Sequence, residues 1–242
     1  MERSNVVTNW FTPLLEAVRK SESAEEAFEA IADAARHLGF EWCAYGYQHP
    51  LPFTQNHCFM ISNYAESWRT RYEEAGYLDV DPTVIHARSS IEPMVWSDDS
   101  FRTATQLWDE ARTFGLRHGW AQSCFGPDGA VGLLSLARDH EPIGNAELLN
   151  KEAELRGLVN VAHAALSRFA CGETCPTHWH LTRREREVMC WAADGKTSAE
   201  TAEILGLSRF TVEFHFRNAV HKVGAGNRAA AVARAAAVGI LR

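Results

Sequence analysis

The feature that most constrains the fold is a run of four helix-forming segments over residues 181–238, with no strand pattern between them. Thr182 and Glu185 have the spacing of a capping box, in which each side chain bonds the backbone N–H of the other residue, so they predict the start of a first helix. Ser198 is the predicted cap of a second helix, and Ser208 is the predicted cap of a third after a three-residue turn that begins with glycine. Two short helices, such a turn and a longer helix are typical of a helix-turn-helix.

The third of these helices, residues 209–223, has two different faces. Val212, Phe216 and Val220 fall together and are predicted to pack in the core. The other face carries charged or polar side chains at four-residue spacing, namely Arg209, Glu213, Arg217 and His221. The third helix of a helix-turn-helix lies in the major groove of DNA, where arginine can bond guanine and glutamate can accept from cytosine.

We therefore predict that Glu213 and Arg217 contact bases. Four further side chains are predicted to contact phosphates: Lys196, Thr197, Arg209 and Thr211. Capped helices with a glycine turn also occur in helical bundles that dimerise without DNA, and spacing alone leaves that alternative open.

The distribution of charge favours DNA binding by the C-terminal part. Residues 176–242 carry a net charge of +4 and residues 1–175 carry −11, which together give the −7 of the whole chain. Only the C-terminal part has the sign that phosphates attract, so the acidic part is expected to point away from DNA.

Residues 171–180, CGETCPTHWH, break every periodicity and are predicted to be a linker. The predicted domains are therefore residues 1–170 and residues 181–242. The linker contains four side chains of the zinc-ligand type, Cys171, Cys175, His178 and His180. Their spacing is cramped, so we predict a solvated tether and no metal site, and we expect the six cysteines to be reduced thiols.

The N-terminal part mixes strand and helix patterns. Strand patterns lie at residues 40–47, 57–62, 119–125 and 131–137, and helical patterns lie at 5–20, 23–38, 65–75, 82–88, 103–114 and 145–170. Helices before, between and after the strands predict an α/β/α sandwich. The predicted fold class is thus α+β, with an N-terminal α/β/α sandwich ligand-binding domain and a C-terminal all-α helix-turn-helix domain.

The ligand-binding prediction begins with residues 63–83, where polar and aromatic side chains gather. Tyr64, Trp68 and Tyr72 share one helical face, and Asp81 follows. Buried hydroxyls, an indole N–H and a carboxylate need hydrogen-bond partners, which a guest molecule with amide and carbonyl groups would supply. In the ordinary alternative, the aromatic residues form core and Asp81 caps a helix that starts with proline.

Segment 181–223 resembles the DNA-binding domain of the LuxR family. The shared pattern is a T-x-x-E start, a W-x-x-x-G-K-T stretch, an I-L-x-L-S turn and T-V-x-x-H. The matching residues are Glu185, Trp191, Gly195, Lys196, Thr197, Thr211, Val212 and His215. Met189 stands where the pattern usually has leucine, and Glu213 stands where it often has Lys, Asn or Arg, which leaves the preferred DNA sequence open.

Residues 10–170 resemble the autoinducer-binding domain of acyl-homoserine lactone receptors, the quorum-sensing branch of that family. The patterns Y-x-x-x-W-R-x-x-Y, G-Y-x-x-x-D-P-T, V-W, F-G-L-x-x-G and L-S-L-A-R match in order. The resemblance implies that Trp68 donates to the lactone carbonyl and that Asp81 accepts from the amide N–H. Tyr64 and Ser135 would contact the acyl carbonyl. The remaining implied contacts are Tyr72 and Trp96 at the lactone end, Thr83 and Arg69 nearby, and Gly119 beside the pocket.

Together the resemblances imply a quorum-sensing transcription regulator that binds an N-acyl-homoserine lactone and needs no cofactor. We also predict a homodimer on two-fold symmetric double-stranded DNA, because one recognition helix reads only a few base pairs, and RNA polymerase is a candidate partner. No apolar run approaches the ~18 residues of a membrane span and no secretion signal is visible, so a cytoplasmic chain without a membrane partner is expected.

Two alternatives remain beside this interpretation. Asp81, His86, His118 and Cys124 are a conceivable catalytic set for a lactone hydrolase, but no nucleophile elbow or metal-hydrolase motif is present, so we predict that the chain is not an enzyme. A ligand-independent DNA-binding protein with a vestigial pocket is the other alternative.

The sensing hypothesis depends on Trp68 and Asp81 facing inward together and being satisfied by a guest molecule rather than by neighbouring side chains. The candidates for the rest of the ligand tunnel are Trp10, Phe11, Phe53, Leu107, Trp120 and Phe125.

Overall fold

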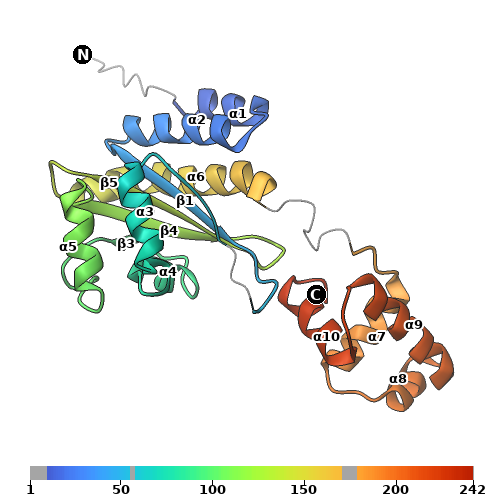
Figure 1. The fold of residues 1–242 in the computed structure, drawn as a ribbon. Helices are drawn as coiled ribbons and strands as arrows, with labels where there is room; N and C mark the ends of the chain where they lie inside the picture. Colours follow the sequence, from blue (N-terminus) through green and yellow to red (C-terminus); the bar gives the residue numbers. More distant parts are fainter. Residues whose placement is uncertain (1–9, 55–57, 171–178, 242) are drawn as a thin grey trace. The chain divides into compact units, whose positions relative to one another are not determined.

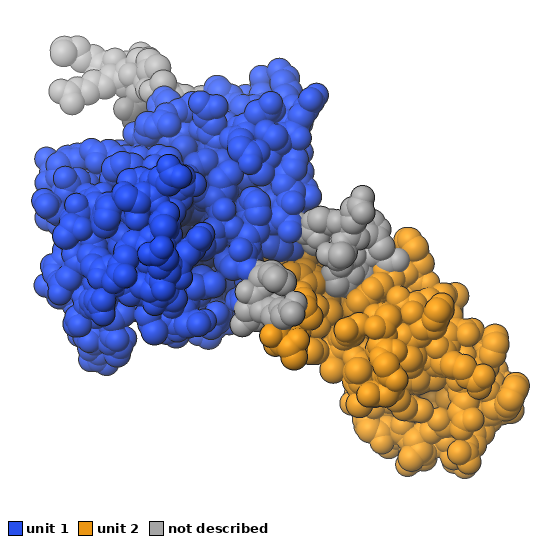
Figure 2. Space-filling view, viewed as in Figure 1, with its two compact units in different colours: residues 1–48, 58–125, 131–171 blue, residues 49–57, 126–130, 172–242 orange. Residues whose placement is uncertain are grey.

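The computed structural model describes residues 10–54, 58–170 and 179–241, which form two compact units (Figures 1 and 2). The first unit is built on one antiparallel sheet in the order β2-β1-β5-β4-β3. The strands are β1 (Trp42–Gln48), β2 (Cys58–Ser62), β3 (Met94–Val95), β4 (His118–Phe125) and β5 (Val131–Arg138). The predicted patterns at 40–47, 57–62, 119–125 and 131–137 each correspond to one of these strands.

Three helices cover one face of the sheet: α1 (Phe11–Lys20), α2 (Ala24–His37) and α6 (Asn145–Ala170) (Figure 1). Ser23 caps α2 as predicted, because its side chain accepts from the backbone N–H of Glu26. The Glu26 carboxylate accepts from the backbone of Glu22 instead of returning a bond to Ser23, so the capping box is only half formed. Arg138 at the end of β5 pairs with Glu147 at 2.7 Å and fixes the start of α6 against the sheet.

The opposite face of the sheet is covered by shorter elements, which are α3 (Glu66–Glu74), a 3₁₀ turn (Tyr77–Asp79), α4 (Pro82–Ala87) and α5 (Thr105–Thr113). The short helices α3 and α4 come from residues 63–83, the stretch in which the sequence gathers polar and aromatic side chains. Trp68 is the one buried side chain of α3 and joins a core cluster with Tyr77 and Phe101 on this face.

The second unit contains α7 (Arg183–Ala193), α8 (Ser198–Leu205), α9 (Arg209–Lys222) and α10 (Arg228–Ala237). Thr182 and Glu185 form the predicted capping box at α7. The prediction that Ser198 caps the second helix is wrong, because Thr197 is the cap and forms a second capping box with Glu200. The Ser198 hydroxyl instead accepts from Arg228 at 2.9 Å.

The core of the second unit holds the predicted inward face of α9. Val212 and Phe216 are buried, while Val220 is half-buried beside them. A partly buried ion pair adds to this packing, since the Lys222 ammonium lies 2.7 Å from the buried Glu185 carboxylate and joins the end of α9 to the start of α7.

The fold class is confirmed: an α/β/α sandwich precedes an all-α helix-turn-helix unit. The helix predicted from residue 5 begins at Phe11 among the described residues, and residues 1–9 lie outside them. Within the described part of the chain, no helix is long and apolar enough to cross a membrane.

Candidate functional site

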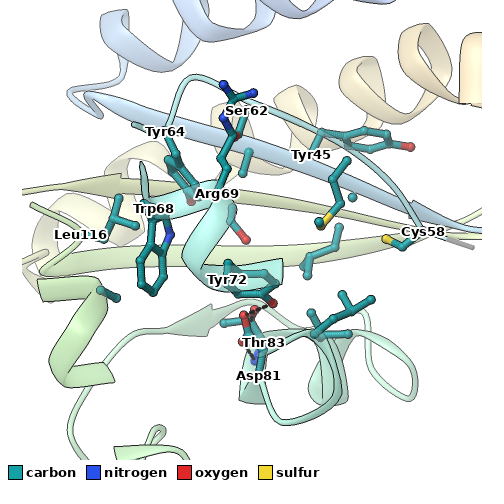
Figure 3. Close-up of a pocket in the computed structure, with 18 of the residues that line it drawn as sticks. Tyr45, Cys58, Ser62, Tyr64, Trp68, Arg69, Tyr72, Asp81, Thr83 and Leu116 are labelled. Carbon is teal, nitrogen blue, oxygen red and sulfur yellow. Dashed lines mark hydrogen bonds between the residues drawn. The ribbon is translucent and has the colours of Figure 1, made fainter. Parts of the chain in front are cut away.

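A cavity of about 380 Å³ lies between the sheet and the short helices α3 and α4 (Figure 3). Its volume falls within the range of small-molecule sites. All eight side chains predicted to contact a ligand line this cavity: Tyr64, Trp68, Arg69, Tyr72, Asp81, Thr83, Trp96 and Ser135. They come from α3, α4, the β3 end and the middle of β5, so the fold brings together residues that are up to about seventy positions apart.

Asp81 joins α3 to α4 in the wall of the cavity. Its Oδ1 accepts from the backbone N–H of Thr83 at 2.8 Å and from the Thr83 hydroxyl at 2.7 Å, while its Oδ2 accepts from the Tyr72 hydroxyl at 2.9 Å (Figure 3). Asp81 is therefore the cap of α4 and a cavity residue at once. The expectation that a guest molecule rather than neighbouring side chains satisfies this carboxylate is wrong, because Tyr72 and Thr83 already donate to it.

The carboxylate still has capacity for a further donor. An ionised carboxylate offers about four lone-pair sites, and the Oδ2 atom of Asp81 receives a single side-chain bond, from Tyr72. Burial raises the pKa of Asp81 above its usual value, and the bonds from Thr83 and Tyr72 oppose that shift. An additional N–H donor from a guest would favour the charged form further.

Four uncharged donors on the cavity-lining residues predicted to contact a ligand make no hydrogen bond to any described residue. They are the indole N–H groups of Trp68 and Trp96 and the hydroxyls of Tyr64 and Ser135. Burial is the largest cause of the raised pKa of Tyr64, so this hydroxyl stays a neutral donor. These uncharged donors and the Asp81 carboxylate suit a guest that carries carbonyl oxygens and one N–H.

Small residues keep the floor of the cavity open around Ser135. This serine lies in the middle of β5, opposite Ala44 of β1 and Ala121 of β4. A methyl side chain on each neighbouring strand leaves the hydroxyl uncovered on the cavity side.

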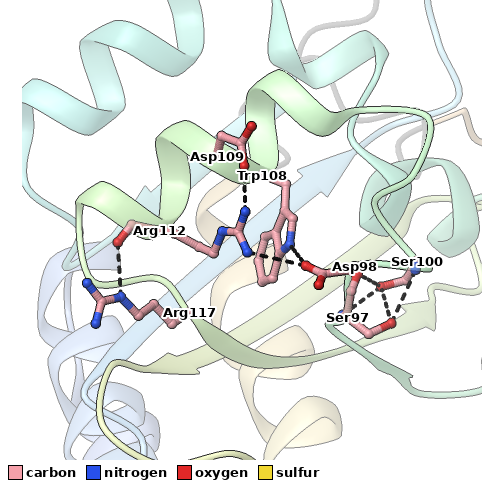
Figure 4. Close-up of polar contacts among 7 residues, drawn as sticks. All are labelled: Ser97, Asp98, Ser100, Trp108, Asp109, Arg112 and Arg117. Atoms are coloured by element: carbon pink, nitrogen blue, oxygen red, sulfur yellow. Dashed lines mark hydrogen bonds and ion pairs between the residues drawn. The ribbon is translucent and has the colours of Figure 1, made fainter.

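Trp96 forms the cavity wall near α5. Its ring lies against Gly119, where an added β-carbon would come within 2.1 Å of the indole, so this position needs glycine. Its edge-on neighbours are Phe101 and Trp108. Trp108 is held in turn, because its indole N–H donates to Asp98 at 2.6 Å and Arg112 lies over its ring (Figure 4).

The sequence did not identify the part of the cavity lining that β1, β2 and the first half of β5 supply. It includes Gly46, Gln48, Cys58, Met60, Val131 and Leu133. None of the six tunnel candidates (Trp10, Phe11, Phe53, Leu107, Trp120 and Phe125) lines the cavity. The alternation within the strands was a usable signal, but only strand order shows which face meets the cavity.

The structure does not assemble the conceivable catalytic set. His118 and Cys124 lie near opposite ends of β4, and six residues of strand separate them by ~20 Å. His86 is half-buried and bonded to the backbone carbonyl of Glu92. Only Asp81 of the four lines the cavity.

The predicted DNA contacts are spread over the starts of α8 and α9 and the exposed side of α9. Lys196 and Thr197 are exposed just before α8, but the Thr197 hydroxyl is engaged with Glu200. Arg209 and Glu213 pair with each other at 2.9 Å. The backbone N–H of Thr211 donates to the Ser208 hydroxyl, which caps α9. Arg217 is exposed and has no ion pair among the described residues.

The Cys and His cluster of the linker lies outside the described residues except for His180. Among the residues that are described, no group of three or more His, Cys, Asp or Glu side chains is placed to hold a metal ion. The described cysteines, Cys43, Cys58, Cys124 and Cys190, are free thiols.

Two family models match the chain. The autoinducer binding domain matches residues 23–166, and the luxR family of bacterial regulatory proteins matches residues 180–235. The chain is 37% identical over 236 residues to the transcriptional activator protein AnoR of Acinetobacter nosocomialis, a match that covers 96% of this chain and 99% of AnoR.

Solved structures extend the likeness to three dimensions. SdiA of Escherichia coli in complex with octanoyl-rac-glycerol is 34% identical with a TM-score of 0.81, and the match covers 100% of this chain and 99% of that one. CepR2 of Burkholderia cenocepacia, described as an N-acylhomoserine lactone dependent transcription factor, is 31% identical with a TM-score of 0.63 over 67% of this chain and 96% of its own.

Proposed function

The chain belongs to the LuxR family of quorum-sensing transcription regulators, with an autoinducer-binding domain ahead of its DNA-binding domain, and from this premise we propose that its signal is an N-acyl-homoserine lactone. Its full-length relatives are transcription regulators rather than enzymes, in agreement with the expectation that this chain catalyses no reaction. The observation that carries the proposal is that unpartnered donors and the Asp81 carboxylate line a single cavity.

Each polar group of such a ligand has a matching group in the cavity. The Trp68 indole donates to the lactone carbonyl, and the open site on Asp81 accepts from the amide N–H. The hydroxyls of Tyr64 and Ser135 donate to the acyl carbonyl. Tyr72, Thr83 and Trp96 hold the lactone end in place, and the exposed Arg69 lies at the rim.

Apolar surface in the rest of the cavity suits the acyl chain. Met60 of β2 and Leu133 of β5 supply apolar lining on either side of Gly46 in β1. The complex of SdiA with octanoyl-rac-glycerol supports an acylated ligand in general, and the description of CepR2 supports the lactone in particular.

The proposal extends to DNA. A homodimer would place two copies of α9 on a two-fold symmetric site, since a single recognition helix reads only a few base pairs. In this proposal Lys196, Thr197, Arg209 and Thr211 contact phosphates, while Glu213 and Arg217 reach bases. Such a regulator acts in the cytoplasm, where RNA polymerase is a candidate partner.

The test uses the full chain produced in bacteria that make no acyl-homoserine lactone. Thermal unfolding is measured with N-butanoyl, N-octanoyl and N-dodecanoyl homoserine lactone and with octanoyl-rac-glycerol, because a ligand that binds only the folded state raises the midpoint. We expect a lactone to stabilise the chain most, and Trp68→Phe to weaken its binding about three- to ten-fold through loss of one hydrogen bond.

Trp191→Phe, the same change in the second unit, serves as the control and should leave lactone binding unchanged. If octanoyl-rac-glycerol binds more tightly than every lactone, or if Trp68→Phe binds like the parent chain, the lactone assignment is overturned.

A further inference from the structure

Two phenylalanines are exposed on α9, the helix proposed to enter the major groove. Phe210 is 75% exposed and Phe214 is 48% exposed, although both are large apolar side chains. They are four residues apart and so are neighbours on the helix surface. We refer to them as the phenylalanine pair.

The pair occupies the centre of the exposed face of α9. The buried residues of this helix are Val212, Phe216 and Ala219. At about 100° per residue, Phe210 and Phe214 stand within roughly 30° of the line directly opposite them. The part of α9 that projects farthest from the core of its unit is therefore apolar along its first two turns.

Two charged residues of the first turns, Arg209 and Glu213, lie beside the pair and form an ion pair with each other. Glu213 stands roughly 90° from that central line, and its carboxylate pairs with Arg209 at 2.9 Å. The Arg217 side chain, one turn beyond Phe214, is the first exposed cation on this face without an ion pair among the described residues.

We propose that Phe210 and Phe214 read thymine by contact with its 5-methyl group, an inference that rests on the proposed DNA-binding function. The first residues of a recognition helix contact base edges in the major groove, and the thymine methyl is the one apolar group that base pairs present there. A phenyl ring that is solvated in free protein gains by covering that methyl, whereas it gains nothing from a phosphate or a carbonyl edge.

The proposal changes which residues set the DNA sequence. The phenylalanine pair adds thymine contacts to the base contacts proposed for Glu213 and Arg217, with Glu213 at the flank of the exposed face. The preferred half-site then contains thymine beside the guanine that an arginine selects.

The test combines a change in the protein with a change in the DNA. A duplex is first selected from a random-sequence pool by the full chain with N-octanoyl homoserine lactone present. Each thymine of the selected site is then replaced by deoxyuridine, which removes only the 5-methyl group, and dissociation constants are measured for the parent chain, Phe210→Ala, Phe214→Ala and the control Ile204→Ala. Ile204 is an exposed apolar residue of α8.

We expect one or two thymine positions at which deoxyuridine weakens binding of the parent chain about three- to five-fold. At those positions one phenylalanine variant should bind thymine and deoxyuridine equally, while Ile204→Ala keeps the difference. Thermal unfolding of both phenylalanine variants should match the parent chain, because the substituted side chains are exposed.

Retention of the full thymine preference by both phenylalanine variants would overturn the inference and leave DNA binding intact. The same holds if deoxyuridine has no effect at any position, or if Phe210→Ala lowers transcription without changing the thymine preference, since the pair would then serve a protein partner. A parent chain that selects no sequence at all would instead refute the proposed function, and the inference with it.

Discussion

The indole of Trp96 rests directly on Gly119 of β4, so closely that a β-carbon at residue 119 would lie 2.1 Å from the ring. The contact joins the cavity wall to the sheet without an intervening side chain. Gly119 therefore sets the position of the Trp96 ring, which forms the cavity wall at the lactone end of the proposed ligand.

Gly119→Ala should displace Trp96 and reshape the cavity. We expect a loss of about 1–3 kcal/mol in the free energy of unfolding, as for other overpacked sites, together with weaker ligand binding. Urea unfolding of the first unit and the ligand-induced thermal shift measure the two effects. Gly144→Ala is the matched control, since nothing lies within 4 Å of a β-carbon there; equal behaviour of the two variants would contradict the close contact.

The two cavity tyrosines should separate stability from ligand binding. Tyr72 donates to Asp81 and Tyr64 has no hydrogen-bond partner among the described residues, so only Tyr72→Phe should destabilise the ligand-free chain, by about 1 kcal/mol. Tyr64→Phe should leave the ligand-free chain unchanged and weaken ligand binding about three- to ten-fold. Unfolding in urea with and without N-octanoyl homoserine lactone measures both effects. If Tyr64→Phe destabilises the ligand-free chain, the Tyr64 hydroxyl has a hydrogen-bond partner within the protein and the expectation is wrong.

The Glu185–Lys222 pair should make the second unit sensitive to acid. Burial raises the pKa of Glu185, but bonds from Lys222 and Thr182 outweigh it and leave the pKa below the ordinary value of 4.5. A group with a lowered folded-state pKa stabilises above the pKa of the unfolded chain, and this contribution is lost as pH falls through the folded value. Glu185→Gln should therefore cost about 1–3 kcal/mol at neutral pH and progressively less below pH 4.5.

Hydrogen exchange resolved to peptides of α7 and α9 measures this loss. Glu187→Gln is the control, because Glu187 pairs with Arg183 and Arg184 at the surface, where solvent screening leaves an ion pair little effect on stability. If Glu185→Gln lowers exchange protection relative to the parent chain by the same factor at neutral pH and below pH 4.5, the charge of the pair does not stabilise the unit.

Arg217→Ala should relax the DNA sequence at a single base-pair position, at a cost of about 1–3 kcal/mol. Arg184→Ala removes an exposed arginine from α7 and should lower affinity similarly for every sequence, or not at all. Binding to a panel of single-base variants of a selected site distinguishes the outcomes, and an unchanged preference in Arg217→Ala would remove this residue from base recognition.

Much of the fold follows from local sequence signals. The capping box at Thr182, the side-chain cap at Ser23 and the turn before Ser208 depend on residues within three or four positions, so these three helix starts were predictable to within a residue. The error at Thr197 has the same local character: Thr197 and Ser198 are both good caps, and only Thr197 has a glutamate three residues later.

The candidate site was harder to predict from the sequence, because the order of the strands in the sheet decides which residues lie next to one another. Pattern and resemblance brought Trp68, Asp81 and Ser135 together, but the Gly46 and Leu133 lining depends on β1 lying next to β5. The exposed position of Phe210 was missed for a different reason: charge drew attention to Arg209 and Glu213, whose mutual pairing only the coordinates show.

The cap of α4 has a consequence for how occupancy of the cavity can be observed. Asp81 holds the first turn of that helix through Thr83 and also faces the cavity. Binding of a molecule to this carboxylate is therefore coupled to the opening of that turn. By reciprocity, whatever tightens the turn must tighten the guest by the same factor. The hydrogen-exchange rate of the Thr83 amide should thus depend on the fraction of molecules whose cavity is occupied, and it can be measured without a label.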